Sequence, residues 1–173
     1  LRQWVSYCHL RGVKVYLTLN TLVLDRELKN AAAEILEASR AGVDAILVQD
    51  LGVCQLVKSL APDVPIHAST QMTITGVDMA RWLESQGMER IVLSRELSAD
   101  EIRRIRQSTG MELEVFVQGA LCYCYSGQCL MSSMIGGRSG NRGRCAQPCR
   151  LPYQAGDDKN ASFLLSPKDI CTL

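Results

Sequence analysis

Short runs of branched apolar residues alternate with amphipathic stretches along the first two thirds of the chain. The apolar runs predict strands at residues 13–20, 43–48, 64–67, 90–93 and 113–117. Apolar positions at helical spacing predict helices over residues 25–41, 51–60, 75–86 and 98–108, and the first residues of the chain have the pattern of a helix interior. Strands and helices that alternate in this way are typical of a parallel sheet with helical crossovers.

This rhythm favours an α/β fold of the (β/α) barrel type. The chain lacks the glycine-rich loops that bind nucleotides in many doubly wound sheets. A complete barrel takes about 250 residues and the chain has 173, so we expect an incomplete TIM-like barrel. A flavodoxin-like open sheet has the same periodicity and remains the alternative.

The expected organisation is a single domain with two parts. Residues 1–118 would form the partial barrel, and residues 119–173 a cysteine-rich segment that also supplies one further barrel strand at residues 162–165. Both ends of the sequence look internal to a longer protein, so the rest of its own chain is an expected partner.

Polar residues follow the predicted strands. Active sites of barrels lie at the carboxyl ends of their strands, so we expect these side chains to meet at one mouth. The candidate catalytic residues are His67, Asp50, Glu96 and Gln71, and the candidate substrate contacts are Asn20 and Arg95. The competing interpretation is structural: a hydrogen-bonded histidine, and carboxylates that cap the following helices or pair with Arg95.

Composition and charge narrow the range of functions. Hydrophobic residues make up 47% of the chain and charged residues 21%, with a net charge of +1, so no bulk charge draws the whole chain to nucleic acid. No apolar run reaches the 18 or so residues of a membrane-spanning helix. We therefore expect a cytoplasmic protein without a membrane partner.

The cysteines are clustered rather than spread. Five of the eight lie between residues 122 and 149, and another is Cys171. Clustered cysteines in a chain without a secretory signal bind metal or react more often than they form disulfides. Their spacing leaves three alternatives open: an iron–sulfur cluster, a zinc ion, or redox or structural thiols.

A glycine-rich basic run lies between these cysteines. It contributes Arg138, Arg142 and Arg144, and residues 119–150 contain no acidic residue. The guanidinium groups could stabilise an anionic cluster or bind a phosphate or carboxylate of a substrate. A plain surface loop is the third possibility.

Long motifs in this region resemble those of the peptidase U32 family. The run EVFVQGALCYCYSGQCLMS at residues 114–132 resembles the family signature, and NRGRCAQPCR at residues 141–150 and LSPKDIC at residues 165–171 are similar to its continuation. TLN at residues 18–20 and HASTQ at residues 67–71 also look like this family. The resemblance covers essentially the whole chain, and the intact basic run looks most like the ribosomal RNA cytidine hydroxylase branch.

The resemblance implies a function that residue spacing does not. Members of this family include collagenase-like peptidases and proteins that hydroxylate tRNA or rRNA bases, for which a 4Fe-4S cluster and a prephenate-like co-substrate are expected. Carried over by position, the cluster ligands would be Cys122, Cys129, Cys145 and Cys171, with Cys124 a bystander and Cys149 structural. The leading expectation is iron–sulfur-dependent RNA nucleobase hydroxylation, with RNA as partner. The alternatives are a collagenase-like peptidase acting on peptides and a non-catalytic module stabilised by zinc or thiols.

Overall fold

The computed structural model describes residues 1–156 and 160–171. Its α-helices are α1 (Arg2–His9), α2 (Leu28–Ala41), α3 (Leu51–Leu60), α4 (Val77–Ser85), α5 (Ala99–Ser108) and α6 (Met131–Gly136). Its strands are β1 (Tyr16–Leu19), β2 (Ala45–Val48), β3 (Ile66–Ala68), β4 (Arg90–Val92), β5 (Glu112–Glu114), β6 (Gln118–Gly119) and β7 (Ile170–Cys171). Short 3-10 helices form at η1 (Asp25–Glu27), η2 (Thr70–Met72), η3 (Gly140–Arg142) and η4 (Pro148–Arg150).

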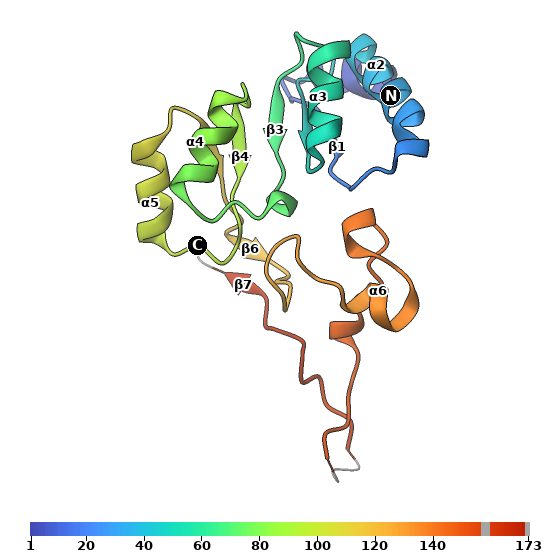
Figure 1. The fold of residues 1–173 in the computed structure, drawn as a ribbon, viewed down its shortest axis with the longest axis vertical. Helices are drawn as coiled ribbons and strands as arrows, with labels where there is room; N and C mark the ends of the chain where they lie inside the picture. The colour runs from blue at the N-terminus through green and yellow to red at the C-terminus, as the bar shows by residue number, and fades with distance from the viewer. Residues whose placement is uncertain (157–159, 172–173) are drawn as a thin grey trace.

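Strands β1 to β5 form one parallel sheet in sequential order (Figure 1). The order does not reverse at any strand, as it would in a flavodoxin-like sheet. It is the order of a (β/α) barrel, and the α/β class and parallel sheet predicted from the sequence are confirmed. Within the described residues the sheet stays open, because β1 and β5 each pair on one side only.

Helices α2 to α5 pack against one face of this sheet. Ile35 of α2, Val57 of α3 and Leu83 of α4 join Ile46 and Ile91 of the strands in one buried core. The amphipathic spacing that predicts each helix is therefore the spacing of its buried face. Helix α2 ends where Gly42 takes a left-handed conformation with φ of 80°, which residues without a Cβ adopt at least cost.

The other face of the sheet carries polar side chains. Arg90 of β4 bonds Glu112 and Glu114 of β5, and its guanidinium lies 5.3 Å from the ring centre of Tyr16 in β1. His67 of β3 stacks edge-on against Tyr16 with 5.0 Å between ring centres. Strand residues alternate between the two faces, so this face also carries Ala45, Leu47 and Val92, which lie in register with Tyr16, His67 and Glu114.

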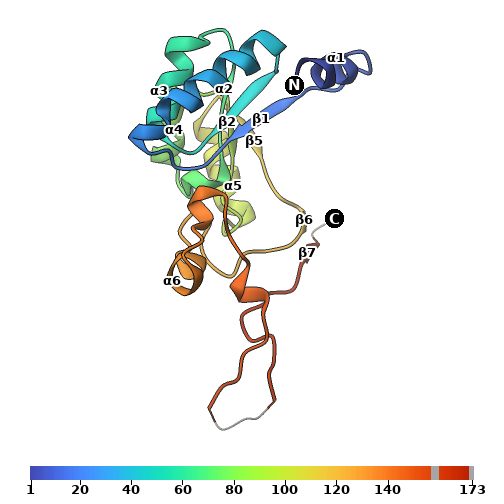
Figure 2. The same ribbon diagram turned by 90° about the vertical axis from the view of Figure 1, so that its right-hand side faces the viewer.

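The cysteine-rich segment lies at one end of the α/β body, and Figure 2 shows it extending away from the sheet. Its two ends meet in the antiparallel pair β6–β7, where Gln118 pairs with Cys171. The predicted barrel strand at residues 162–165 is wrong: Ser162 forms only an isolated bridge with Tyr153, and Leu164 and Leu165 lie in a turn. The apolar residues at 162–165 predicted a strand, but within the described part of the chain no strand lies beside them to pair with.

No helix among the described residues is long and apolar enough to cross a membrane.

Candidate functional site

A tight turn at residues 125–128 attaches the cysteine-rich segment to the strand ends. Ser126 is completely buried; its backbone N–H and its hydroxyl donate to Oε1 of Glu96 at 2.8 and 3.1 Å. Thr73 donates its hydroxyl to the carbonyl of Ser126 at 2.7 Å, and Arg95 makes longer contacts to the Ser126 hydroxyl at 3.3 and 3.4 Å. Glu96 and Arg95, which the sequence suggests as catalytic and substrate-binding residues, thus hold the turn in place.

Gly127 brings the same turn into direct contact with the backbone of η2. A Cβ on Gly127 would lie 2.1 Å from the carbonyl oxygen of Gln71, and the residue has φ of 74°. Only glycine fits both the contact and the left-handed backbone. The turn that precedes Cys129 is therefore in direct contact with the backbone of Gln71, another predicted catalytic residue.

A second attachment joins the basic run to the connection after β1. Arg142 donates to Oε1 and Oε2 of Glu27 at 2.5 and 2.7 Å and to the carbonyl of Leu22 at 2.6 Å, while Leu22 donates to Asn141. The hydrogen bond from Arg142 lowers the pKa of Glu27 to about 2, so the pair is ionised at neutral pH. Both terminal nitrogens of Arg142 thus donate to acceptors within the chain, and its predicted role in binding a substrate anion stays a prediction.

Arg150 joins three parts of the segment. Its guanidinium donates to the carbonyl of Leu121 at 2.8 Å, to that of Pro167 at 2.7 Å and to the hydroxyl of Ser166 at 2.8 Å. It also lies 3.9 Å from Asp169. Since Leu121 precedes Cys122, and residues 166–169 lead into β7, Arg150 fixes the two arms that carry the first and last of the predicted ligands.

The thiols gather in part. The pKa of Cys124 is raised, first by burial and then by the nearby Cys129, with a smaller contribution from Cys122. Cys145 accepts a backbone hydrogen bond from Gln147 at 3.3 Å. Nevertheless, no three His, Cys, Asp or Glu side chains in the described ranges are close enough together to hold a metal ion. Cys124, expected to be a bystander, lies among the predicted ligands.

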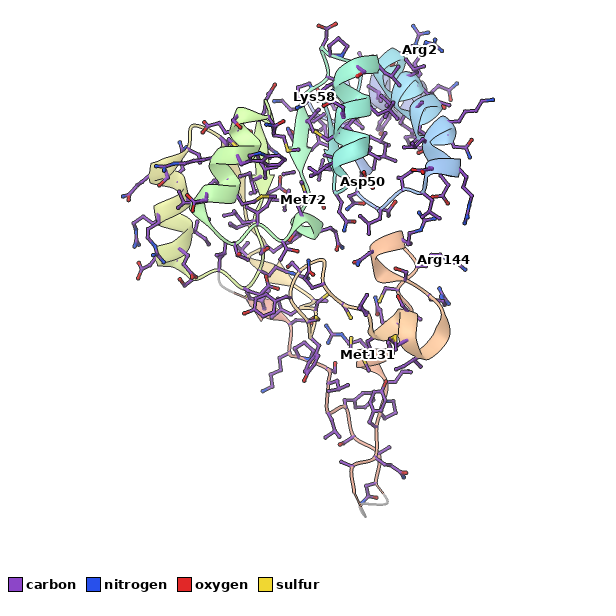
Figure 3. The ribbon with its side chains drawn as sticks, viewed as in Figure 1. Arg2, Asp50, Lys58, Met72, Met131 and Arg144 are labelled. Atoms are coloured by element: carbon purple, nitrogen blue, oxygen red, sulfur yellow. The ribbon has the colours of Figure 1, made fainter. Side chains whose placement is uncertain are left out.

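At the strand ends, Asp50 has a structural part. Its Oδ1 accepts from the N–H groups of Gly52 and Val53 at the start of α3, and its Oδ2 accepts from Val23 at 3.1 Å. Both oxygens are used, so the helix-capping alternative is confirmed for Asp50, and its predicted catalytic role stays a prediction. Figure 3 shows Asp50 at the edge of the sheet that faces the segment carrying Arg144.

The remaining polar residues at the strand ends are joined by long hydrogen bonds. Asn20 donates to the hydroxyl of Ser69, and Gln49 to the carbonyl of Gln71, each at 3.4 Å. His67 lies deeper, only 5% exposed, and burial followed by the Arg90 charge lowers its pKa. The atoms His67 Nδ1, Gln49 Oε1 and Ser94 Oγ are buried with no hydrogen-bond partner among the described residues. The hydrogen bond that the structural alternative for His67 expects is therefore not formed at Nδ1 within the described residues.

Two exposed arginines remain for an anionic ligand. Arg138 donates from Nε to the carbonyl of Arg144 at 3.1 Å, which braces the loop. The side chain of Arg144 has no ion pair or hydrogen bond within the described part of the chain. The predicted anion-binding role therefore stays a prediction for Arg138 and Arg144.

Sequence reasoning missed the residues that hold the segment in place. Thr73, Ser126, Gly127 and Arg150 belong to no recognised catalytic pattern, and Glu27 lies in a helix 115 residues before Arg142. The only sequence signal was the position of Ser126, Gly127 and Arg150 inside the long motifs.

The chain matches the model of Peptidase family U32 over residues 1–173. It is 44% identical, over 98% of its length, to the 23S rRNA 5-hydroxycytidine synthase of Escherichia coli, and 36% identical, over 92%, to the tRNA hydroxylation protein P of that organism. It spans 26% and 35% of those two relatives. The solved U32 peptidase Mk0906 has a similar fold, with a TM-score of 0.57 at 18% identity, over 69% of this chain and 51% of that one. The resemblance found in the motifs is confirmed, and the chain belongs to peptidase family U32.

Proposed function

We propose that this chain is part of an enzyme that hydroxylates a nucleobase in RNA with the help of an iron–sulfur cluster. The observation that carries the proposal is the similarity, over nearly the whole chain, to two proteins named for hydroxylated rRNA and tRNA. A cysteine-rich segment attached at the carboxyl ends of a parallel sheet supports it, since that is where (β/α) folds carry their chemistry. An RNA-modifying role would be exercised in the cytoplasm.

The cluster would be held by Cys122, Cys129, Cys145 and Cys171. Their donor chemistry suits it, because four soft thiolates from separate loops are the usual ligands of a 4Fe-4S cluster. The N–H group of Gln147 directed at the Cys145 sulfur is a contact that tunes such clusters. When bound, the cluster would supply one-electron redox chemistry.

Residues of this chain would position the ligand loops and neutralise the negative charge of the substrate or co-substrate. The Ser126 and Arg142 attachments hold the loops that carry Cys129 and Cys145 over the strand ends. Arg144, whose side chain is exposed, would attract RNA phosphate or an anionic, prephenate-like co-substrate. His67 would remain neutral at physiological pH because its pKa is lowered, and so could accept or donate a hydrogen bond to a ligand without adding charge.

The test uses full-length protein purified without oxygen. Iron and acid-labile sulfide are measured in the wild type, in Cys129→Ala and in the control Cys8→Ala, whose cysteine lies in α1 outside the segment. We expect a stoichiometric cluster that Cys129→Ala loses and Cys8→Ala keeps. Zinc or no metal in repeated anaerobic preparations would refute the cluster and favour the zinc- or thiol-stabilised module.

A second measurement tests the substrate. RNA from cells that lack the gene is compared by mass spectrometry with RNA from cells complemented by the wild type or by Cys129→Ala. We expect an oxygen-bearing base only with the wild type. Unmodified RNA together with cleaved collagen-like peptides would overturn the hydroxylase proposal and support the peptidase.

A further inference from the structure

Cys124 lies among the proposed cluster ligands without being one of them. Its thiol is free, as is that of Cys129, and both side chains are partly buried. Burial raises the pKa of Cys124, and the charge of Cys129 and a hydrogen bond between the two thiols raise that pKa further. Cys122 contributes less, although it is only two residues away in the sequence. The side chain of Cys124 therefore faces that of Cys129 rather than that of its near neighbour.

A closed turn holds these two cysteines on opposite arms of the chain. Gln128 donates its N–H to the carbonyl of Tyr125 at 3.1 Å, so residues 125–128 form a β-turn. Cys124 comes just before this turn and Cys129 just after it. Residues opposite each other on antiparallel arms lie about 4.5–5.5 Å apart between Cα atoms, within the roughly 4.4–6.8 Å that a disulfide spans. An S–S bond can therefore form by rotation of the side chains.

The α/β body fixes the turn, and with it the distance between the two thiols. Ser126 donates twice to Glu96, and Gly127 lies directly against the carbonyl of Gln71. Two thiols that are held close together react with each other far more readily than with thiols in solution. A disulfide here would close a short ring of partly exposed residues, and strained or exposed disulfides are the ones that are easily reduced.

We infer that Cys124 is the redox partner of Cys129: when no cluster is bound, oxidation joins the two in a reversible disulfide that protects Cys129 from irreversible oxidation. The inference rests on the proposed function only for the cluster. The disulfide and the cluster exclude each other, because a cluster ligand must be a thiolate and a sulfur atom in an S–S bond is not one. Cys129 would thus alternate between two partners, the cluster and Cys124.

The oxidation balances with hydrogen peroxide as the oxidant. The Cys129 thiol takes one oxygen atom and becomes a sulfenic acid, and one water is released. The sulfur of Cys124 then attacks the Cys129 sulfur, the S–S bond forms, and the sulfenic oxygen leaves as a second water. The two thiols have given two electrons and two protons to the peroxide. Without a neighbouring thiol the sulfenic acid is oxidised further to sulfinic and sulfonic acids, which dithiols do not reverse.

The first experiment treats full-length, cluster-free protein with hydrogen peroxide, blocks the remaining thiols and maps chymotryptic peptides by mass spectrometry. Cleavage after Tyr123, Tyr125 and Leu130 separates all three cysteines of this region. We expect the peptide of Cys124 to be linked to that of Cys129 in the wild type and in the matched control Cys122→Ser. In Cys124→Ser, Cys129 should instead gain two or three oxygen atoms. Linkage of Cys129 to Cys122, or a wild-type Cys129 that is oxidised beyond the sulfenic acid, would overturn the inference.

The second experiment tests the protection on protein that carries the cluster. Wild type and Cys124→Ser are purified without oxygen, exposed to peroxide, returned to anaerobic conditions with a dithiol, iron and sulfide, and assayed for iron and acid-labile sulfide. Before exposure the two proteins should contain equal iron; afterwards the wild type should regain its cluster and Cys124→Ser several-fold less. A loaded wild type beside an unloaded Cys124→Ser would make Cys124 a ligand and overturn the inference, as would equal recovery. Failure of the proposed function gives a different result: the Cys124–Cys129 disulfide in a protein that never takes up iron.

Discussion

The close contact between Gly127 and Gln71 makes the substitution Gly127→Ala a sharp test of how the cysteine-rich segment is held. The new Cβ would lie 2.1 Å from the Gln71 carbonyl oxygen, a distance that real Cβ atoms do not reach, so the turn must move by about 1 Å. A movement of that size lengthens the bond from Thr73 to Ser126, now 2.7 Å, beyond hydrogen-bonding distance, and disturbs both bonds from Ser126 to Glu96.

The chain offers a matched control for this substitution. Gly137 also has a left-handed backbone, with φ of 63°, but a Cβ there meets nothing within 4 Å. Both alanine variants carry the backbone penalty of about 1–2 kcal/mol. Only Gly127→Ala should also lose the three hydrogen bonds of the turn, at about 1 kcal/mol each, or about 3 kcal/mol in total.

Native-state hydrogen exchange of the Ser126 and Gln128 amides measures the difference. A loss of about 3 kcal/mol in local opening free energy accelerates exchange about a hundredfold relative to Gly137→Ala. Alkylation of Cys129 should become faster in the same variant. Exchange rates that agree within about threefold between the two variants would refute the idea that this contact holds the segment.

Three further substitutions test the other contacts. Glu27→Gln removes the ion pair with Arg142, so the amides of residues 137–145 should exchange faster than in the control Glu37→Gln. The pKa of Glu27 is lowered from 4.5 to about 2, so in the wild type the same increase in exchange should develop only as the pH falls from about 4.5 toward 2. His67 has a folded-state pKa below 6.5, so the unfolded chain binds the extra proton and stability falls as pH drops below about 6.5; in urea titrations at two pH values, His67→Gln should lose less stability than the wild type. Arg150→Lys keeps the positive charge but cannot make the three hydrogen bonds at once. It should lower the iron content of anaerobically purified protein several-fold. An unchanged iron content would show that Arg150 does not position the segments that carry Cys122 and Cys171.

The α/β body could be predicted from the sequence because its information is local. The spacing of Ile35 and Ala38 along α2 and the apolar run around Ile46 in β2 are patterns of a few residues, and each describes the face that is buried. The position of Asp50 is also local information: it lies just before a helix, so the sequence already offered helix capping as the alternative to a catalytic role. Strand and helix ends moved by a few residues, as hydrogen bonding between neighbours decides them.

The cysteine-rich segment could not be predicted in this way because its contacts are between residues far apart. Arg142 pairs with Glu27 across 115 residues, and Ser126 pairs with Glu96 across 30. The cysteine-rich segment has no hydrophobic periodicity from which its course could be predicted. A basic run between cysteines suggested anion binding for Arg142, but a carboxylate of the chain itself occupies that guanidinium. The motifs identified the family without indicating which of their residues hold the segment in place.

These contacts give the four predicted ligands a shared property that their spacing alone does not reveal. Cys129 follows the Ser126 attachment by three residues, Cys145 follows Arg142 by three, Cys122 follows the carbonyl that Arg150 binds, and Cys171 lies in β7. Closing a loop costs conformational entropy that grows with the length of free chain, so fixing the chain beside each thiol reduces the cost of bringing the four together. The thiols themselves keep few contacts, and Cys122, Cys145 and Cys171 are exposed. Fixed neighbours beside exposed thiols would let the chain bind the proposed cluster without refolding around it. The attachment residues, as well as the cysteines, should therefore determine how much of the proposed cluster the chain retains.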